Sequence, residues 1–203
     1  MMKLFWSSRS PYARKVMVIA HEAGLAGRID RIAVSVSPYA VEESLLPYNP
    51  LGRIPTLVTD TGETLFESLA ICDHLDSLAA RSACYPAGVD RPMVIRAHAL
   101  GNGLTDLGIA WVRERMRGSG GTPPDFVAAA RIKIARTCDR LDADIDTLCG
   151  SVPHVGAAAI GCALAYLDFR MPDEDWRAGH PRLAAWQARF SARPSMRATE
   201  HHD

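Results

Sequence analysis

Three short stretches in the first third of the chain could act on a small ligand. The first is Ser10-Pro11, where a hydroxyl stands at the predicted N-terminus of a helix. Free N–H groups and the helix dipole favour an anion at such a place. A serine hydroxyl can accept a hydrogen bond from the helix and still donate its proton to a ligand sulfur. A thiol has an ordinary pKa of about 8.5, so little of it is thiolate at neutral pH. The helix N-terminus at Ser10 would increase the thiolate fraction of a bound thiol.

Ser10 also has a purely structural interpretation. Serine followed by proline is a good helix start, so Ser10 could serve only as an N-cap. Ser7 and Ser8 lie in the same loop and are rivals for the functional role, with Ser8 the stronger rival.

The second stretch is Asn49–Pro55, in which Ile54-Pro55 precedes the strand-like residues Thr56–Val58. Proline cannot donate to a sheet, so it belongs at a strand start or a tight bend. A cis peptide is expected at this bend. Held extended there, Ile54 could pair its N–H and C=O with a peptide-like ligand, as one more strand. Arg53, taken alone, is interpreted as a solvated surface charge.

The third stretch is Glu67-Ser68, at the start of a predicted helix. Its structural interpretation is a helix cap with an acidic residue in the first turn. Its functional interpretation is a site for an amino-acid head group, because Ser68 with the helix N–H groups suits a carboxylate and Glu67 suits an ammonium. In order, the three stretches could hold a small peptide with a central thiol.

The elements that must position these residues follow a thioredoxin-like order, β-α-β and then β-β-α, over residues 1–78. We expect strands at Lys3–Trp6, Ile29–Val36 and Thr56–Val58, a hairpin turn at Asp60–Glu63, and helices from Ser10 to Ala23 and from Ser68. A linker over 79–88 and an all-helical domain over 89–203 follow, with helices near 91–117, 124–149, 155–170 and 181–192. A Gly/Pro-rich break at 118–124 separates two of them, the small residues Gly156–Gly161 predict close helix packing, and Glu200–Asp203 are predicted to form a frayed tail.

Composition excludes several classes of function. The 203 residues include 23 basic and 23 acidic ones, which argues against a nucleic-acid or polybasic membrane surface. No apolar run reaches membrane-spanning length, and no signal peptide is expected. The five cysteines form no C-x-x-C pair and no metal-like cluster, so we expect reduced thiols, a cytoplasmic location and no metal.

The chain resembles the cytosolic glutathione S-transferase family in three motifs, Ser10–Val16, Asn49–Pro55 and Glu67–Ile71. The resemblance extends over nearly the whole chain. Helical-domain segments such as Thr105–Gly108 and Ala165–Arg170 resemble its small bacterial YibF-like group. The resemblance implies that Ser10 activates the glutathione thiol and that Ile54, ahead of a cis Pro55, pairs with the cysteinyl part. It also implies that Glu67 and Ser68 hold the γ-glutamyl end and that Arg53 approaches the glycyl carboxylate.

The expected function is therefore conjugation of glutathione, as co-substrate, to small hydrophobic electrophiles, with peroxide reduction as a further activity. The alternative is a non-catalytic glutathione-fold binding or regulatory module. Serine in place of cysteine weakens a glutaredoxin-like interpretation, because a hydroxyl forms no mixed disulfide. Candidates for the acceptor pocket are Tyr12, Trp111, Arg113 and Met116. Core packing is favoured for Trp111 and a solvated helix face for Arg113. The resemblance also implies a homodimer.

Overall fold

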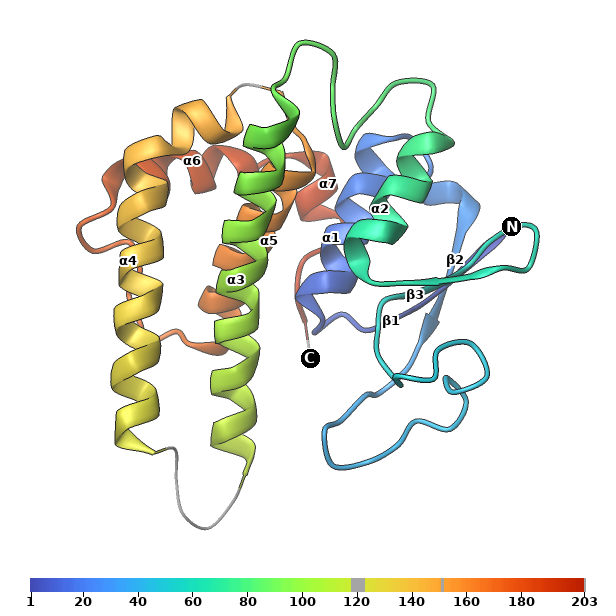
Figure 1. The fold of residues 1–203 in the computed structure, drawn as a ribbon, viewed down its shortest axis with the longest axis horizontal. Helices are drawn as coiled ribbons and strands as arrows, with labels where there is room; N and C mark the ends of the chain where they lie inside the picture. Colours follow the sequence, from blue (N-terminus) through green and yellow to red (C-terminus); the bar gives the residue numbers. More distant parts are fainter. Residues whose placement is uncertain (118–122, 151, 203) are drawn as a thin grey trace. The chain divides into compact units, whose positions relative to one another are not determined.

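The computed structural model describes residues 1–117, 123–150 and 152–202. Its contacts divide the chain into two compact units. Unit 1 comprises Met1–Gly88, Pro153–Val155 and the segment that begins at Pro194, and unit 2 comprises Val89–Val152 and Gly156–Arg193. Unit 1 is α/β and unit 2 is helical, which confirms the predicted fold class (Figure 1). None of the helices described in these ranges has the length and hydropathy needed to cross a membrane.

A four-stranded mixed sheet lies at the centre of unit 1, with the strand order β2-β1-β3-β4. The strands are β1 (Met2–Trp6), β2 (Ile29–Ala33), β3 (Thr56–Val58) and β4 (Thr64–Phe66). Strand β1 runs parallel to β2 and antiparallel to β3, which forms the predicted hairpin with β4. Strand β2 ends before the predicted Val36, because β1 offers no partner beyond Trp6, where the chain turns toward its first helix.

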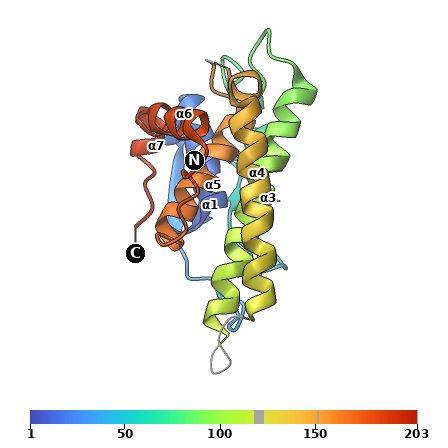
Figure 2. The same cartoon turned by 90° about the vertical axis from the view of Figure 1, so that its left-hand side faces the viewer.

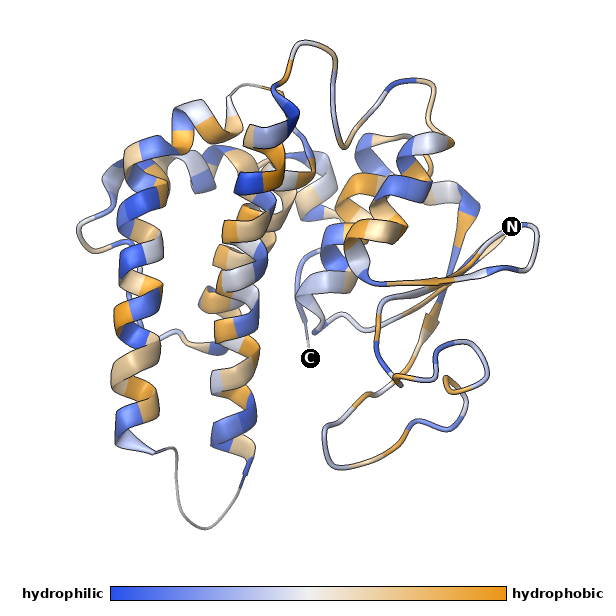
Figure 3. Cartoon of the chain, in the orientation of Figure 1, coloured by the Kyte–Doolittle hydropathy of each residue, from blue (hydrophilic) through white to orange (hydrophobic). Residues whose placement is uncertain are grey.

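The helices of unit 1 are α1 (Pro11–Glu22), the short 3-10 helix η1 (Ala26–Arg28), α2 (Ser68–Ser77) and α7 (Pro194–Arg197). Helices α1 and α2 pack against each other, and α7 packs against α1. Helix α1 is followed by Gly24 at a φ of 71°, a left-handed conformation that glycine adopts readily. In Figure 3 the middle of α1 is hydrophobic, whereas the strands and α2 carry both hydrophobic and polar residues. The buried core of this unit includes Leu4, Val18, Leu57 and Ile71.

The predicted frayed tail is wrong for the described residues up to His202. The Ser8 hydroxyl donates to the carbonyl of His202 at 2.7 Å, and Nδ1 of His201 lies 2.8 Å from the carbonyl of Ser8. Just before these residues, the buried Arg14 guanidinium of helix α1 donates to the carbonyl of Met196 at 3.1 Å. Polar composition predicted solvation, whereas long-range hydrogen bonds to the loop before helix α1 hold this segment. Asp203 lies outside the described residues.

Unit 2 contains α3 (Arg91–Met116), α4 (Pro124–Cys149), α5 (Val155–Arg170, of which Val155 belongs to unit 1) and α6 (Pro181–Ser191). These bounds match the predicted helices within one residue. Helices α3 and α4 lie side by side (Figures 1 and 2), and α6 packs against α4. The predicted break at 118–124 falls mostly outside the described residues.

Small residues bring helices α3 and α5 close together, as predicted. A Cβ atom built on Gly101 would lie 2.5 Å from the backbone of Ala159 and Ile160. One built on Gly161 would lie 2.5 Å from the ring of Phe190. Only glycine therefore fits at these two positions without displacement of a neighbour.

Candidate functional site

Ser10 occupies the N-terminus of helix α1. Its side-chain oxygen accepts a hydrogen bond from the Ala13 N–H at 3.2 Å, and Pro11 is the first helical residue. The Ser10 N–H donates to the carbonyl of Ser7 at 3.0 Å, which closes the loop before the helix. Capping uses only the acceptor capacity of the hydroxyl, so its proton can still be donated. The structural and functional interpretations of Ser10 are thus compatible in this geometry.

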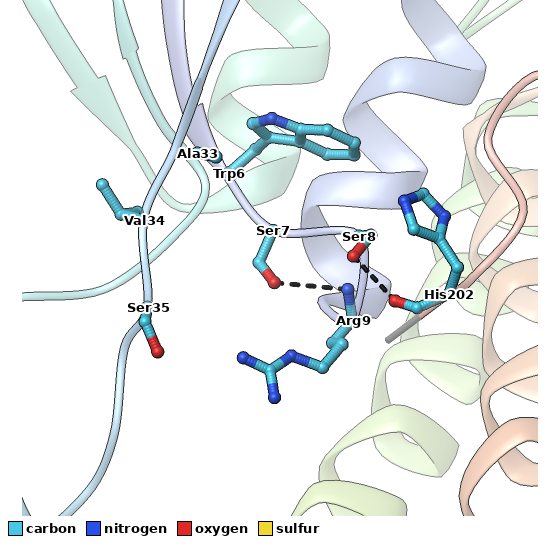
Figure 4. A pocket seen from close by; sticks show the side chains of 8 residues that line it. All are labelled: Trp6, Ser7, Ser8, Arg9, Ala33, Val34, Ser35 and His202. Carbon is cyan, nitrogen blue, oxygen red and sulfur yellow. Dashed lines mark hydrogen bonds between the residues drawn. The ribbon is translucent and has the colours of Figure 1, made fainter.

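The two rival serines differ in their hydrogen bonds (Figure 4). The Ser8 hydroxyl donates to the carbonyl of His202 at 2.7 Å, and the Ser8 carbonyl contacts Nδ1 of His201 at 2.8 Å. The proton of the Ser8 hydroxyl is therefore already donated within the protein. The Ser7 hydroxyl accepts from the Arg9 N–H at 3.3 Å, which leaves its proton available. This geometry makes Ser7 a better-placed rival to Ser10 than Ser8.

The bend before strand β3 is held by one buried amide. The Asn49 side chain is 1% exposed and donates to the carbonyl of Arg53 at 3.0 Å and to the hydroxyl of Thr56 at 2.9 Å. Its oxygen accepts from the Leu51 N–H at 3.0 Å, and the Thr56 hydroxyl donates to the Arg53 carbonyl at 2.8 Å. These bonds tie both ends of the bend together, so its shape is preformed.

Ile54 lies at the middle of this bend, and the Ile54–Pro55 peptide is cis, as predicted. Its side chain is buried in a cluster with Phe5 and Leu45. Within the described residues, the N–H and C=O of Ile54 make no hydrogen bond. A side chain anchored in the core and a backbone without partners are what pairing with an added peptide strand requires. The neighbouring Arg53 is exposed.

Glu67 caps helix α2 with its backbone at a φ of 74°, an uncommon conformation for a residue other than glycine. Its carboxylate accepts from the Leu69 N–H at 3.0 Å and from the Ser68 hydroxyl at 3.2 Å. Ser68 is 2% exposed. Strained backbone of this kind is found preferentially at ligand sites. A carboxylate, a hydroxyl and first-turn N–H groups together match an ammonium and a carboxylate on one ligand.

Comparison with known proteins identifies the family. Residues 9–78 match the model of the glutathione S-transferase N-terminal domain, and residues 109–189 match that of the C-terminal domain. A relative from Escherichia coli (strain K12), named "Uncharacterized GST-like protein YibF", is 30% identical over 202 residues, which cover 98% of both chains. The chain belongs to the glutathione S-transferase family.

Two solved structures of a glutathione transferase family member from Pseudomonas fluorescens Pf-5 are similar to this transferase-family chain over its whole length. One contains bound glutathione, with 36% identity and a TM-score of 0.94 over 100% of each chain. The other contains bound S-(propanoic acid)-glutathione, with 36% identity and a TM-score of 0.89 over 100% of each chain.

An open hollow of about 540 Å³ lies beside the Ser7–Ser10 loop in unit 1 of the transferase-family chain (Figure 4). It is lined by Trp6, Ser7, Ser8, Arg9, Ala33, Val34, Ser35 and His202. The guanidinium of Arg31 lies 4.7 Å from the centre of the Trp6 ring. The hollow therefore combines an aromatic and aliphatic wall with hydroxyl and basic groups.

The four acceptor-pocket candidates are not among the residues that line this hollow, and their assignment stays a prediction. Tyr12 is half-buried near Lys15, whose Nζ atom lies 5.6 Å from the ring centre. Trp111 is 5% exposed and lines a separate cavity of about 230 Å³ within unit 2. Arg113 is exposed, and Met116 is 59% exposed.

Sequence reasoning missed four residues of the site in this family member: Asn49, Thr56, Arg9 and His202. The turn-forming Asn49-Pro50-Leu51-Gly52 was a usable signal for the first, since asparagine bonds the backbone two residues on. No local signal points to His202, because its contact with Ser8 spans most of the chain. Among residues 1–117, 123–150 and 152–202, no cluster of three His, Cys, Asp or Glu side chains could hold a metal.

Proposed function

We propose that this protein is an enzyme that activates the thiol of glutathione for attack on small electrophiles. The observation that carries the proposal is the grouping in unit 1 of a capping hydroxyl at Ser10, an unpartnered backbone at Ile54 and an amino-acid site at Glu67-Ser68. The glutathione bound to the Pseudomonas fluorescens protein supports it.

Glutathione binding would use the backbone and side chains of all three stretches. The N–H and C=O of Ile54 pair with the cysteinyl part, in the manner of an added strand. The Glu67 carboxylate accepts from the γ-glutamyl ammonium, and first-turn N–H groups donate to the γ-glutamyl carboxylate. The Ser68 hydroxyl would join them by exchanging its bond to Glu67 for one to the ligand. Arg53, which is exposed, extends toward the glycyl carboxylate. Contacts on both sides of the cysteinyl residue of glutathione would thus fix the position of its thiol.

Activation of the thiol rests on the N-terminus of helix α1. The Ser10 hydroxyl accepts from Ala13 and donates to the sulfur, and the helix dipole stabilises the negative charge. Both effects lower the pKa of the bound thiol, so more thiolate is present at neutral pH. The thiolate then attacks an electrophile held beside it, and positioning supplies the rest of the rate enhancement.

The test is the pKa of glutathione bound to wild type and to three alanine variants, measured from thiolate absorbance against pH. We expect Ser10→Ala to return the pKa toward its ordinary value of about 8.5, with Ser8→Ala and Ser7→Ala unchanged. Ser10→Thr retains both the hydroxyl and the helix cap, so it should keep the lowered pKa. A shift in Ser7→Ala alone would transfer the role to Ser7. An ordinary pKa in wild type would contradict thiol activation.

Two activities are proposed for the thiolate: conjugation to small hydrophobic electrophiles and reduction of peroxides. Tyr12, Trp111, Arg113 and Met116 remain proposed contributors to the acceptor pocket. A panel of electrophile and peroxide assays separates the two activities. The alternative function, a non-catalytic glutathione-fold binding or regulatory module, predicts no turnover in that panel, and failure to bind glutathione in calorimetry would favour it.

The proposal extends to the organisation and location of the protein. We take residues 1–78 as the glutathione-binding domain, 79–88 as a linker and 89–203 as the helical domain. Five free, buried cysteines support a reducing compartment such as the cytoplasm. Family membership supports a homodimer, which light scattering coupled to size-exclusion chromatography would test.

A further inference from the structure

The described residues that line the hollow beside the Ser7–Ser10 loop carry ionisable groups of only one sign. Arg9 and His202 are its ionisable lining residues, and none of the described residues that line it carries a carboxylate. Trp6, Ala33 and Val34 contribute an apolar wall. A ligand that complements such a surface combines a short apolar part with an anionic group.

Arg9 is the group best able to bind that anion. Its backbone N–H is held by the Ser7 hydroxyl at 3.3 Å, while its side chain extends away from His202 (Figure 4). Within the described part of the chain, its guanidinium has no ion-pair or hydrogen-bond partner. The basic group of the adjacent strand is engaged differently, because the Arg31 guanidinium lies over the Trp6 ring. The planar fork of Arg9 is therefore available to a carboxylate, which it can bind through two parallel hydrogen bonds.

We propose that the acceptor substrate is an α,β-unsaturated carboxylate, whose anionic group is bound by Arg9. The inference rests on the proposed function, because it assumes that the glutathione sulfur lies at Ser10. Arg9 directly precedes Ser10, and the bond from the Ser10 N–H to the Ser7 carbonyl holds both in one short loop. A carboxylate bound by Arg9 would thus be held by the same loop that ends at the thiol-activating hydroxyl.

The reaction of this substrate class needs no further reactant than water. The thiolate attacks the β-carbon, so a sulfur–carbon bond forms as the carbon–carbon π bond breaks. The electron pair moves onto the α-carbon and its carboxylate, and the α-carbon then takes a proton from water. Negative charge on the carboxylate grows during the attack. A guanidinium in contact with it therefore stabilises the transition state more than the bound substrate.

The kinetic test compares monomethyl fumarate, which carries a carboxylate, with the neutral dimethyl fumarate. Each kcat/KM is divided by the rate constant for uncatalysed addition of glutathione, which removes their different intrinsic reactivities. We expect wild type to favour the monoanion, Arg9→Gln to lower its kcat/KM about tenfold and the neutral diester to change less than about twofold. Arg9→Lys should recover part of the loss, because it keeps the charge but not the fork. Arg81→Gln, an exposed arginine of unit 1 outside the hollow, is the matched control.

A binding measurement keeps the inference testable even without turnover. Calorimetry with S-(2-carboxyethyl)glutathione and S-propylglutathione should show about tenfold weaker binding of the first, and unchanged binding of the second, in Arg9→Gln. If Arg9→Gln weakened the binding of both conjugates equally and lowered kcat/KM equally for both fumarate esters, the role of Arg9 in binding the carboxylate would be overturned. Failure of wild type to bind glutathione itself would instead overturn the proposed function. Normal glutathione binding without preference for the anionic compounds would overturn this inference alone.

Discussion

At the residue scale, Asn49 determines the shape of the proposed glutathione clamp. It is buried and forms hydrogen bonds with Leu51, Arg53 and Thr56, while the contact proposed for Ile54 uses only its backbone. The residues that shape a site need not touch its ligand. Here the buried amide keeps the bend preformed, which reduces the ordering cost of binding.

We expect Asn49→Ala to lower the free energy of unfolding by about 2 kcal/mol, because it leaves buried hydrogen-bonding groups without a partner. Glutathione affinity should fall as well, since the bend loses its brace. Urea denaturation and calorimetry measure the two effects. Thr56→Ser keeps the hydroxyl and is the control. Unchanged glutathione affinity in Asn49→Ala would show that the bend does not depend on this amide.

His21 links stability to pH. Burial lowers its pKa below the ordinary 6.5, and the positive charge of Arg31 lowers it further, against a smaller opposing effect of Glu22. The unfolded chain therefore binds a proton near pH 6.5 that the folded chain takes up only at lower pH. Stability from this group is present above pH 6.5 and is lost as the pH falls. In His21→Gln, the decrease in unfolding free energy between pH 7 and pH 5.5 should be smaller than in wild type. An equal decrease would assign the pH dependence to other groups.

At the element scale, the approach of helices α3 and α5 depends on Gly101. A methyl group there would meet the backbone of Ala159 and Ile160 at 2.5 Å, whereas one at Gly103, on the same helix, would meet nothing within 4 Å. Helix propensity alone would favour alanine at both positions. At Gly101, tertiary packing makes alanine destabilising instead of stabilising.

Gly101→Ala is therefore expected to destabilise the protein by about 1–3 kcal/mol through overpacking. Gly103→Ala should stabilise it by about 0.5–1 kcal/mol, because alanine loses less conformational entropy in a helix. Urea denaturation of both variants is the measurement. If both changes stabilise the protein, helices α3 and α5 do not approach each other as closely as in the structure.

At the scale of the whole molecule, all five cysteines are free and buried. Burial raises the pKa of the Cys138 thiol to about 12 and that of Cys149 to about 12, with nearby aspartates adding to the effect. The pKa of Cys84 is also raised, foremost by its hydrogen bond with Cys72 and then by burial. Thiols in this state react slowly. The thiol chemistry of the proposed enzyme therefore belongs to bound glutathione.

The native protein should accordingly resist iodoacetamide at pH 7.5 and keep its glutathione binding. The same treatment in concentrated urea should alkylate all five thiols, as counted by mass spectrometry. Rapid alkylation of a cysteine in the native protein would show that this thiol is accessible and could take part in redox chemistry.

Local sequence was sufficient to predict the elements and most of the proposed site. Serine with proline predicted the start of helix α1, and the X-Pro dipeptide predicted the bend at Ile54, because capping and proline geometry act within a few residues. The Gly/Pro-rich break at 118–124 separated the two long helices in the prediction, which agrees with their described ends within one residue.

Only the tertiary structure decided which loop groups are free to act. Ser8 appeared the stronger rival in sequence, yet its proton is donated to His202, far along the chain. The segment that contains His202 was predicted to fray, because polarity describes a residue's own preference and says nothing of distant partners such as Ser8. The sequence by itself determined which groups are proposed to bind and activate a thiol. Their availability depends on long-range hydrogen bonds, which form only when the chain has folded.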